Sequence, residues 1–175
     1  MLQSNSLLAQ QDFCRSYNWD VTLPSLSTYN GTYQGEDVAL YIQEISFGNY
    51  TINDLTPIRH GPFQTHSAGM FEIGTITMEF LCPTNCIVMS YFDNWKGQIV
   101  DQSDPNNPFY YPKSNYVYNS TVNFYDNGGN NLASYTLLNI FPKTFPSYKL
   151  SYESETMIKF PIEFSVDQIY LNTNT

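Results

Sequence analysis

The sequence predicts a mainly β protein with one helix, folded as an antiparallel β-sandwich or barrel. Three observations carry this prediction. Several segments alternate apolar and polar residues, which is the period of a half-buried strand. A single segment shows apolar residues at helical spacing. The strands also follow one another without the regular intervening helices that a parallel sheet needs. At 175 residues, the chain is long enough for one domain with its own core.

The first predicted elements precede residue 48. Alternating apolar residues between Tyr17 and Leu23 predict a strand that ends at Pro24. Residues 25–37 are rich in Ser, Thr, Gly and Asn, and they are expected to form a loop or a surface insertion. Residues 38–47 return to an apolar, β-favouring composition and predict a second strand.

The middle of the chain predicts an arm, a strand and the helix. Residues 48–69 are interrupted by glycines and prolines, and they are expected to hold an extended hairpin arm. Residues 70–81 alternate and predict a strand. After Pro83, which suits a first helical turn, apolar residues recur at helical spacing. This pattern predicts a helix over residues 84–100 that ends near Gly97.

The last third of the chain predicts a loop, a hairpin and a final strand. Residues 101–113 contain three prolines and are expected to form a loop. Residues 115–125 and 131–141 alternate on either side of an Asn-Gly-Gly-Asn turn, which is a strong hairpin signal. Residues 158–166 alternate throughout, and Pro161 within them indicates an edge strand or a bulge.

These elements predict a single domain over residues 15–170. Residues 1–14 are expected to form an N-terminal arm, and residues 171–175 a C-terminal tail. Aromatic side chains in the predicted strands and helix are expected to anchor the core. The predicted core anchors are Trp19, Tyr91, Phe92, Trp95, Phe160 and Phe164.

The charge of the chain restricts its partners. With only 7 Lys and Arg residues and a net charge of −9, the chain lacks the cations for a nucleic-acid-binding patch. Charged residues make up 13% of the sequence, which is low for the surface of a soluble monomer. We therefore expect neighbouring subunits to cover much of the surface.

The cysteines and histidines predict neither a metal site nor a cofactor. The three cysteines are an odd number, which argues against a disulfide framework. Cys82 and Cys86 have a loose metal-like spacing. A second cysteine pair is missing, and His60 and His66 lie in a different segment. We expect buried free thiols.

Catalytic and membrane signals are also weak. The sequence contains no nucleophile elbow, phosphate-binding loop or zinc-protease motif. A Cys82–His60 dyad and a Glu153–Glu155 carboxylate pair are the nearest alternatives, and we do not expect an enzyme. The N-terminus lacks a signal peptide, and no segment reaches about 18 consecutive apolar residues. Synthesis in a cytoplasm and no membrane insertion are expected.

The order of several motifs resembles a known family. Residues 15–26 read RSYNWDVTLPSL, the predicted helix contains FDNW at residues 92–95, and the hairpin and final strand occupy residues 114–170. In this order and spacing, the motifs resemble the tail-tube proteins of contractile-tailed, T4-type (myovirus-like) bacteriophages. The resemblance spans most of the chain.

The resemblance implies a structural subunit of a virion tail, assembled in the cytoplasm of the bacterial host. Homohexameric rings would stack into a tube, and each subunit would lend strands to a β-barrel around the bore. Genomic DNA would pass through this bore without specific binding. The sheath, baseplate-junction, terminator and tape-measure proteins would be partners. Residues 1–14 and 48–69 are expected to contact other subunits and rings.

Carboxylates on the bore would repel the phosphates of DNA and so help it to slide. Strand parity makes Glu44, Glu72 and Glu79 the candidate lumen-facing acids. Two further interpretations stay open. One is a tube-initiator or baseplate-junction paralogue, or the tube protein of a type VI-like injection system. The other is a tyrosine-rich β-sandwich that binds a receptor or a carbohydrate.

Overall fold

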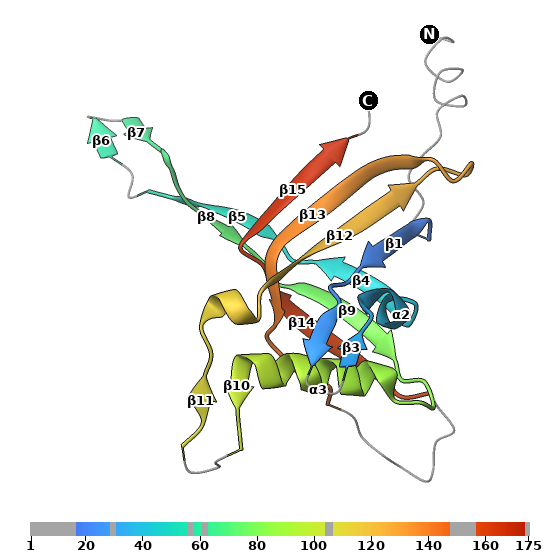
Figure 1. Cartoon of the computed structure of the whole chain (residues 1–175). Helices are drawn as coiled ribbons and strands as arrows, with labels where there is room; N and C mark the ends of the chain where they lie inside the picture. Colours follow the sequence, from blue (N-terminus) through green and yellow to red (C-terminus); the bar gives the residue numbers. More distant parts are fainter. Residues whose placement is uncertain are drawn as a thin grey trace.

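A seven-stranded antiparallel sheet and one long helix form the body of the protein, and a hairpin projects from it (Figure 1). The structure, a computed structural model, describes residues 17–28, 31–55, 58–60, 63–103, 107–147 and 157–173. The elements in chain order are β1 Trp19–Thr22, β2 Leu26–Thr28, β3 Gly31–Tyr33, α2 Gly35–Ala39, β4 Ile42–Phe47, β5 Tyr50–Asp54, β6 Ile58–His60, β7 Phe63–Thr65, β8 Ala68–Ile73, β9 Ile76–Leu81, α3 Ile87–Ile99, β10 Val100–Asp101, β11 Phe109–Tyr110, the 3-10 helix η1 Lys113–Asn115, β12 Tyr118–Tyr125, β13 Asn131–Pro142, β14 Lys159–Ser165 and β15 Gln168–Thr173.

The long strand β13 divides the sheet into two parts. The order is β1-β12-β13-β14-β9-β4, and β15 also pairs with β13. β14 and β15 follow one edge of β13 in a single register, with Phe141 opposite Ser165 and Leu138 opposite Gln168. The two parts then face each other, because the ring of Phe47 on β4 lies 5.3 Å from that of Tyr135 on β13. The predicted antiparallel, mainly β fold is confirmed.

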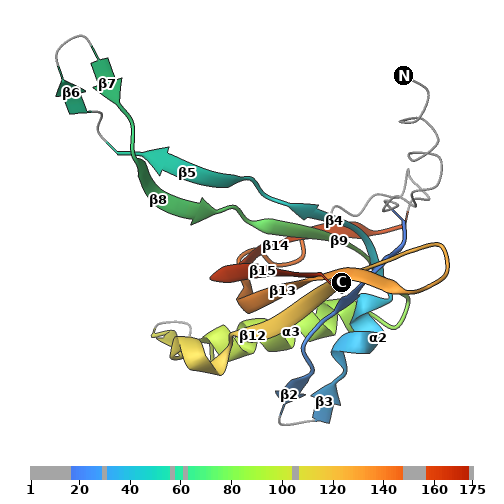
Figure 2. The same ribbon diagram turned by 90° about the horizontal axis from the view of Figure 1, so that it is seen from above.

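Helix α3 covers one opening of this folded sheet (Figures 1 and 2). Its Phe92 ring makes an edge contact with Phe80 of β9 at 5.0 Å, and it lies 6.1 Å from Phe164 of β14. The Trp95 ring meets Tyr118 of β12 edge-on at 5.6 Å. Such pairs add to the stabilisation that burial of aromatic surface already gives. The core therefore lies between α3 and both parts of the sheet.

The polar atoms of the buried aromatics have partners. The Trp95 indole N–H donates to the Tyr116 carbonyl at 2.8 Å, and the Tyr91 hydroxyl donates to the Pro24 carbonyl at 2.6 Å. Burial raises the pKa of Tyr91, so this hydroxyl stays a donor. These bonds remove the cost of placing polar groups in an apolar core.

Two predictions before residue 48 are wrong. Residues 25–37 are not a loop, because they contain the β2–β3 hairpin and the start of the short helix α2. The strand predicted for residues 38–47 begins only at Ile42, since Val38 belongs to α2. Leu26 and Val38 are fully buried, so tertiary packing of these two side chains outweighs the loop-like composition around them. The helix α3 is therefore not the only helix.

The single strand predicted for residues 70–81 is two strands, β8 and β9. The break lies where the junction between β4 and β5 of the same chain comes close: the Gly48 N–H donates to the Thr75 carbonyl, and the Gly74 N–H to the Asn49 carbonyl. A Cβ on Gly48 would lie 2.5 Å from the Thr75 oxygen. Glycine at this position therefore permits a backbone approach that any larger residue would block.

Three further boundaries differ from those predicted. Helix α3 begins at Ile87, because Cys86 adopts a left-handed φ of 54°, and it continues past Gly97 to Ile99. The 101–113 segment is not only a loop, since β10 and β11 pair within it. The chain continues as strand β15 to Thr173, beyond the domain end predicted at residue 170.

Pro161 lies in β14 opposite Glu79 of β9. On its other side, β14 pairs with β13 only at Phe164 and Ser165. Pro161 therefore lies where one side of the strand lacks a ladder partner among the described residues, which a residue without an N–H tolerates.

Candidate assembly surfaces

Strands β1, β12, β13 and β15 form a four-stranded sheet, here called the polar sheet. Cross-strand register places its outward side chains in two rows that cross all four strands. The first row is Asp20, Asn123, Ser134 and Asn172, and the second is Thr22, Thr121, Thr136 and Tyr170. The surface that these rows make is called the polar face below.

Hydrogen bonds connect the polar face from strand to strand. Asn123 Nδ2 donates to Asp20 Oδ1 at 2.7 Å, and the Ser134 hydroxyl donates to Asn123 Oδ1 at 2.7 Å. Asn172 Nδ2 donates to Thr136 Oγ1 at 3.0 Å. The Tyr125 hydroxyl also donates to Asp20, at 2.8 Å, and this bond raises the pKa of Tyr125.

The polar sheet is almost free of charge. Over the described strands β1, β12, β13 and β15, the sequence contains no Lys or Arg, and Asp20 is the sole acid. Apart from the Asp20 carboxylate, the two rows consist of side chains with amide or hydroxyl groups. A surface of this kind offers no cation to a phosphate, and its one fixed charge repels an anion.

Both edges of the polar sheet are open within the described part of the chain. β1 pairs only with β12 there, and β15 only with β13. All pairs are antiparallel, so β1 and β15, at the two ends of a four-strand order, run in opposite directions. A second copy placed edge to edge would therefore present its β1 antiparallel to β15 of the first, and the ladder would continue in the same pattern.

The β15 edge also leaves core-type side chains uncovered. Leu171 lies opposite Tyr135 in the register and shares a sheet face with Ile169, yet it is 53% exposed. Ile169 packs partly against the core. The hydrophobic layer therefore continues to the edge of the sheet, where no other described strand covers it.

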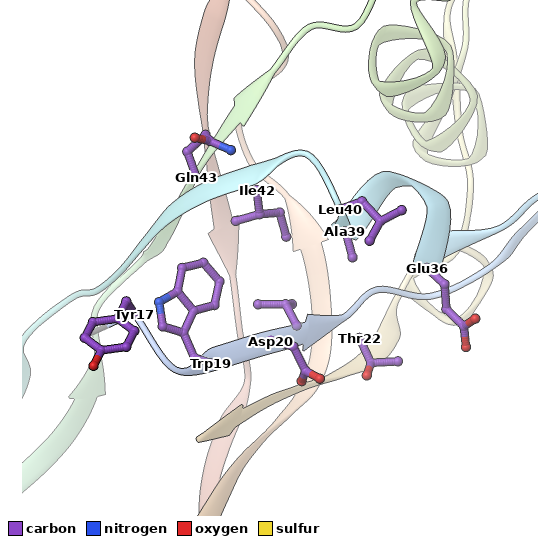
Figure 3. A pocket seen from close by; sticks show the side chains of 10 residues that line it. Tyr17, Trp19, Asp20, Thr22, Glu36, Ala39, Leu40, Ile42 and Gln43 are labelled. Carbon is purple, nitrogen blue, oxygen red and sulfur yellow. The ribbon is translucent and has the colours of Figure 1, made fainter. Parts of the chain in front are cut away.

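A groove of about 630 Å³ lies beside the opposite edge, between β1 and β4 (Figure 3). Trp19 of β1 and Ile42 of β4 line opposite walls, and Ala39 and Leu40 close the end formed by α2. β4 pairs only with β9 among the described strands. Asp20, Glu36 and Gln43 add polar groups to this lining, and among the described strands the groove has an open strand edge on each side.

The projecting hairpin, called the arm, consists of β5 and β8 and continues into β6 and β7 (Figures 1 and 2). It lies on the β15 side, because Phe71 and Ile73 of β8 share a groove of about 560 Å³ with residues 166–170. Exposed apolar side chains on it are Tyr50, Ile52, Leu55, Met70 and Phe71. A two-stranded hairpin is marginally stable alone, and exposed apolar side chains of this kind are typical of interaction surfaces.

The three predicted lumen-facing acids lie outside the polar sheet. Glu44 of β4 is opposite Glu79 of β9, whose carboxylate forms a 2.8 Å ion pair with Lys159. Glu72 lies on the arm and accepts a hydrogen bond from Asn53. Strand parity and charge in the sequence do not identify the polar face. One signal for it is present, because Asp126 is the sole charged residue between residues 115 and 141.

The predicted core anchors lie in two environments. Trp95, Tyr91 and the phenylalanines at positions 92, 160 and 164 are fully buried. Trp19 is half-buried and lines the groove between β1 and β4. The predicted arm at residues 1–14 lies outside the described residues. In the described ranges no cluster of metal-ligating side chains occurs, and no helix is long and apolar enough to cross a membrane.

Comparisons with solved structures show the fold. A chain of the sheath–tube complex from an extracellular contractile injection system (PVC) superposes with a TM-score of 0.66 at 15% identity, covering 98% of this chain and 99% of that chain. The tube-terminating cap of the anti-feeding prophage gives 0.67 at 15%, covering 99% of each chain. The PVC sheath/tube terminator gives 0.63 at 13%, covering 94% and 99%.

The search of curated proteins finds no match to this sequence. Residues 15–172, nearly the whole chain, match the phage tail tube protein family. The chain therefore belongs to this family of structural proteins of the phage tail.

Proposed function

We propose that the chain is a non-enzymatic wall subunit that closes rings by pairing the β15 edge of one copy with the β1 edge of the next. The observation that carries the proposal is the polar sheet, which has four antiparallel strands and an open edge at each end. Pairing of two different surfaces is a heterologous contact, and repetition of such a contact generates a ring when the rotation closes. The family resemblance supports six copies per ring.

In this ring the polar faces line the bore. Six polar sheets joined edge to edge make one continuous antiparallel barrel, and the open edges disappear. Asp20 then repeats around the axis and the remaining lining is amide and hydroxyl. DNA meets no cation to hold its phosphates, so it slides during genome ejection. In this arrangement Glu44, Glu72 and Glu79 do not line the bore.

The arm of one copy then lies against the groove of its neighbour. The arm projects from the β15 side of the molecule, and the groove flanks β1, which is the strand that β15 would meet. Ile52 and Phe71 on the arm match the apolar lining that Trp19 and Ile42 give the groove. This contact buries apolar surface on both copies and adds to the main-chain pairing.

Stacked rings would form the tube of a virion tail assembled in the host cytoplasm, with the sheath, baseplate-junction, terminator and tape-measure proteins as partners. The names of the similar structures, which include a sheath–tube complex and a tube-terminating cap, support such partners. A cap or junction subunit with this fold would instead form a single ring. Stacked rings in electron micrographs would therefore indicate a tube subunit, and single rings would indicate a cap or junction subunit.

The Leu171→Lys variant tests the β15 edge. A charge at this position blocks burial against the neighbour. We expect circular dichroism to show a folded chain and negative-stain electron micrographs to show no rings or tubes. Met157→Lys is the matched control, because Met157 is 77% exposed, precedes β14 and belongs to neither edge strand. Assembly by Leu171→Lys as complete as that of the control would refute the proposed contact.

A further inference from the structure

The turn between β9 and α3 brings two thiols together. The Cys86 N–H donates to the Pro83 carbonyl at 2.9 Å, which closes a turn directly after Cys82. The Cys86 thiol is also close enough to raise the pKa of the Cys82 thiol, after the larger effect of burial. Each thiol also lies against a carbonyl inside the turn: Cys82 Sγ is 3.7 Å from the Pro83 oxygen, and Cys86 Sγ is 3.9 Å from that of Thr84.

The backbone on both sides of the turn is fixed. The Cys82 N–H donates to the Ile158 carbonyl at 2.9 Å, which ties this residue to the chain before β14. The Cys86 carbonyl accepts the first helical bond of α3, from Ser90 at 3.0 Å. Asn85 Oδ1 accepts from the Ile87 N–H at 3.2 Å and holds the turn from inside. The main chain that carries both thiols is therefore fixed on either side of one short turn, and a disulfide needs two cysteines whose backbones are close.

We propose that Cys82 and Cys86 are a redox-active dithiol site that closes to an intramolecular disulfide, with a small-molecule disulfide such as oxidised glutathione as the oxidant. The Cys86 thiol is exposed and Cys82 is half-buried. Cys86, as its thiolate, attacks one sulfur of the oxidant, forms a mixed disulfide and releases one glutathione thiolate. Cys82 loses its proton to solvent, attacks the Cys86 sulfur and releases the second glutathione.

The electron balance is complete in these two steps. The protein loses two electrons and two protons, and the oxidant gains them as two thiols. Burial, and to a lesser extent the adjacent Cys86, raises the pKa of the Cys82 thiol. The second step therefore quickens as the pH rises above neutrality, because a larger fraction of Cys82 is then thiolate.

The bond would link the end of β9 to the residue that precedes α3. Because α3 carries Tyr91, Phe92 and Trp95 into the core, restraint at its first turn stabilises the folded state relative to the unfolded chain. The loop that the bond closes is short, so we expect a rise in Tm of a few degrees. The inference does not depend on ring formation.

The test uses the full chain, purified with reductant and then incubated with oxidised glutathione. We expect a mass loss of about 2 Da, for two hydrogens, in the tryptic peptide between Arg59 and Lys96. The thiol of Cys14 should remain titratable, and the Tm should rise. Dithiothreitol should reverse both changes.

Two variants give the controls. Cys86→Ser should lose the mass change and the Tm shift, whereas Cys14→Ser should keep both. Three results would overturn the proposal: a glutathione adduct on Cys86 that persists, a disulfide that includes Cys14, or two unmodified thiols at positions 82 and 86 after prolonged oxidation.

Discussion

At the scale of single residues, Trp95 connects α3 to both parts of the sheet. Its ring lies within 6.4 Å of the rings of Tyr91, Phe92, Tyr118 and Phe164, and its indole N–H has a carbonyl partner. Helical spacing of aromatic residues in the sequence predicts this packing, because the period fixes which side chains share a face. The hydrogen bond to Tyr116 could not be predicted, since it depends on how β12 approaches the helix.

Replacement of Trp95 by Ala removes these contacts and leaves a cavity. We expect the free energy of unfolding to fall by about 3–5 kcal/mol, measured by urea denaturation. Trp95→Phe is the matched control. It retains a ring and loses the bond to the Tyr116 carbonyl, so its loss should be clearly smaller. An alanine variant as stable as the natural chain would show that α3 does not pack as described.

At the scale of elements, the long strands and the long helix are predictable and the short elements are not. The β12–β13 hairpin follows from alternation around an Asn-Gly-Gly-Asn turn, and Asp126 holds that turn by accepting from the Gly128 and Asn130 N–H groups at 2.8 Å. α2 has only five residues and begins at a glycine, so its pattern is too short to identify. Its position depends on the packing of Val38.

Strands β1 and β15 and the arm are proposed to form the contacts between subunits, and a change on the arm tests one of these contacts. Phe71 is 56% exposed and stacks on Tyr50 at 5.9 Å, so it contributes little to the core. We expect Phe71→Ser to unfold at nearly the same temperature as the natural chain and to need a higher protein concentration for assembly, as measured by sedimentation.

The matched control for Phe71→Ser is Phe109→Ser. Phe109 is 60% exposed on β11, which is outside the proposed contacts. Equal effects of the two substitutions on assembly would show that the arm has no specific role.

At the scale of the whole molecule, the acidic side chains of β4, β8 and β9 lie apart from the nearly uncharged polar sheet. The sequence has a net charge of −9, but this total does not reveal where the acids lie. Strand parity alone pointed to Glu44, Glu72 and Glu79. The structure places Glu44 and Glu79 on β4 and β9, which the fold at β13 separates from the polar sheet, and Glu72 on β8, which pairs only with β5 among the described strands. Long-range strand pairing of this kind is not encoded in a local pattern.

Positive charge on the polar face should slow DNA. We expect tubes with both Thr136→Lys and Asn172→Lys to assemble and to release the genome more slowly, in a salt-dependent manner, because the added cations hold phosphates. Genome release followed by dye fluorescence measures this effect. Ser46→Lys, on β4, is the control. Release that is as fast from the double variant as from the control would argue against a bore formed by the polar face.

A cryo-electron microscopy reconstruction of the assembled protein tests the central claim most directly. In the proposed ring, β15 of each subunit pairs antiparallel with β1 of the next, and the row from Asp20 to Asn172 faces the axis. A bore lined by β4 and β9, with Glu44 and Glu79 toward the axis, or by helix α3, would contradict it.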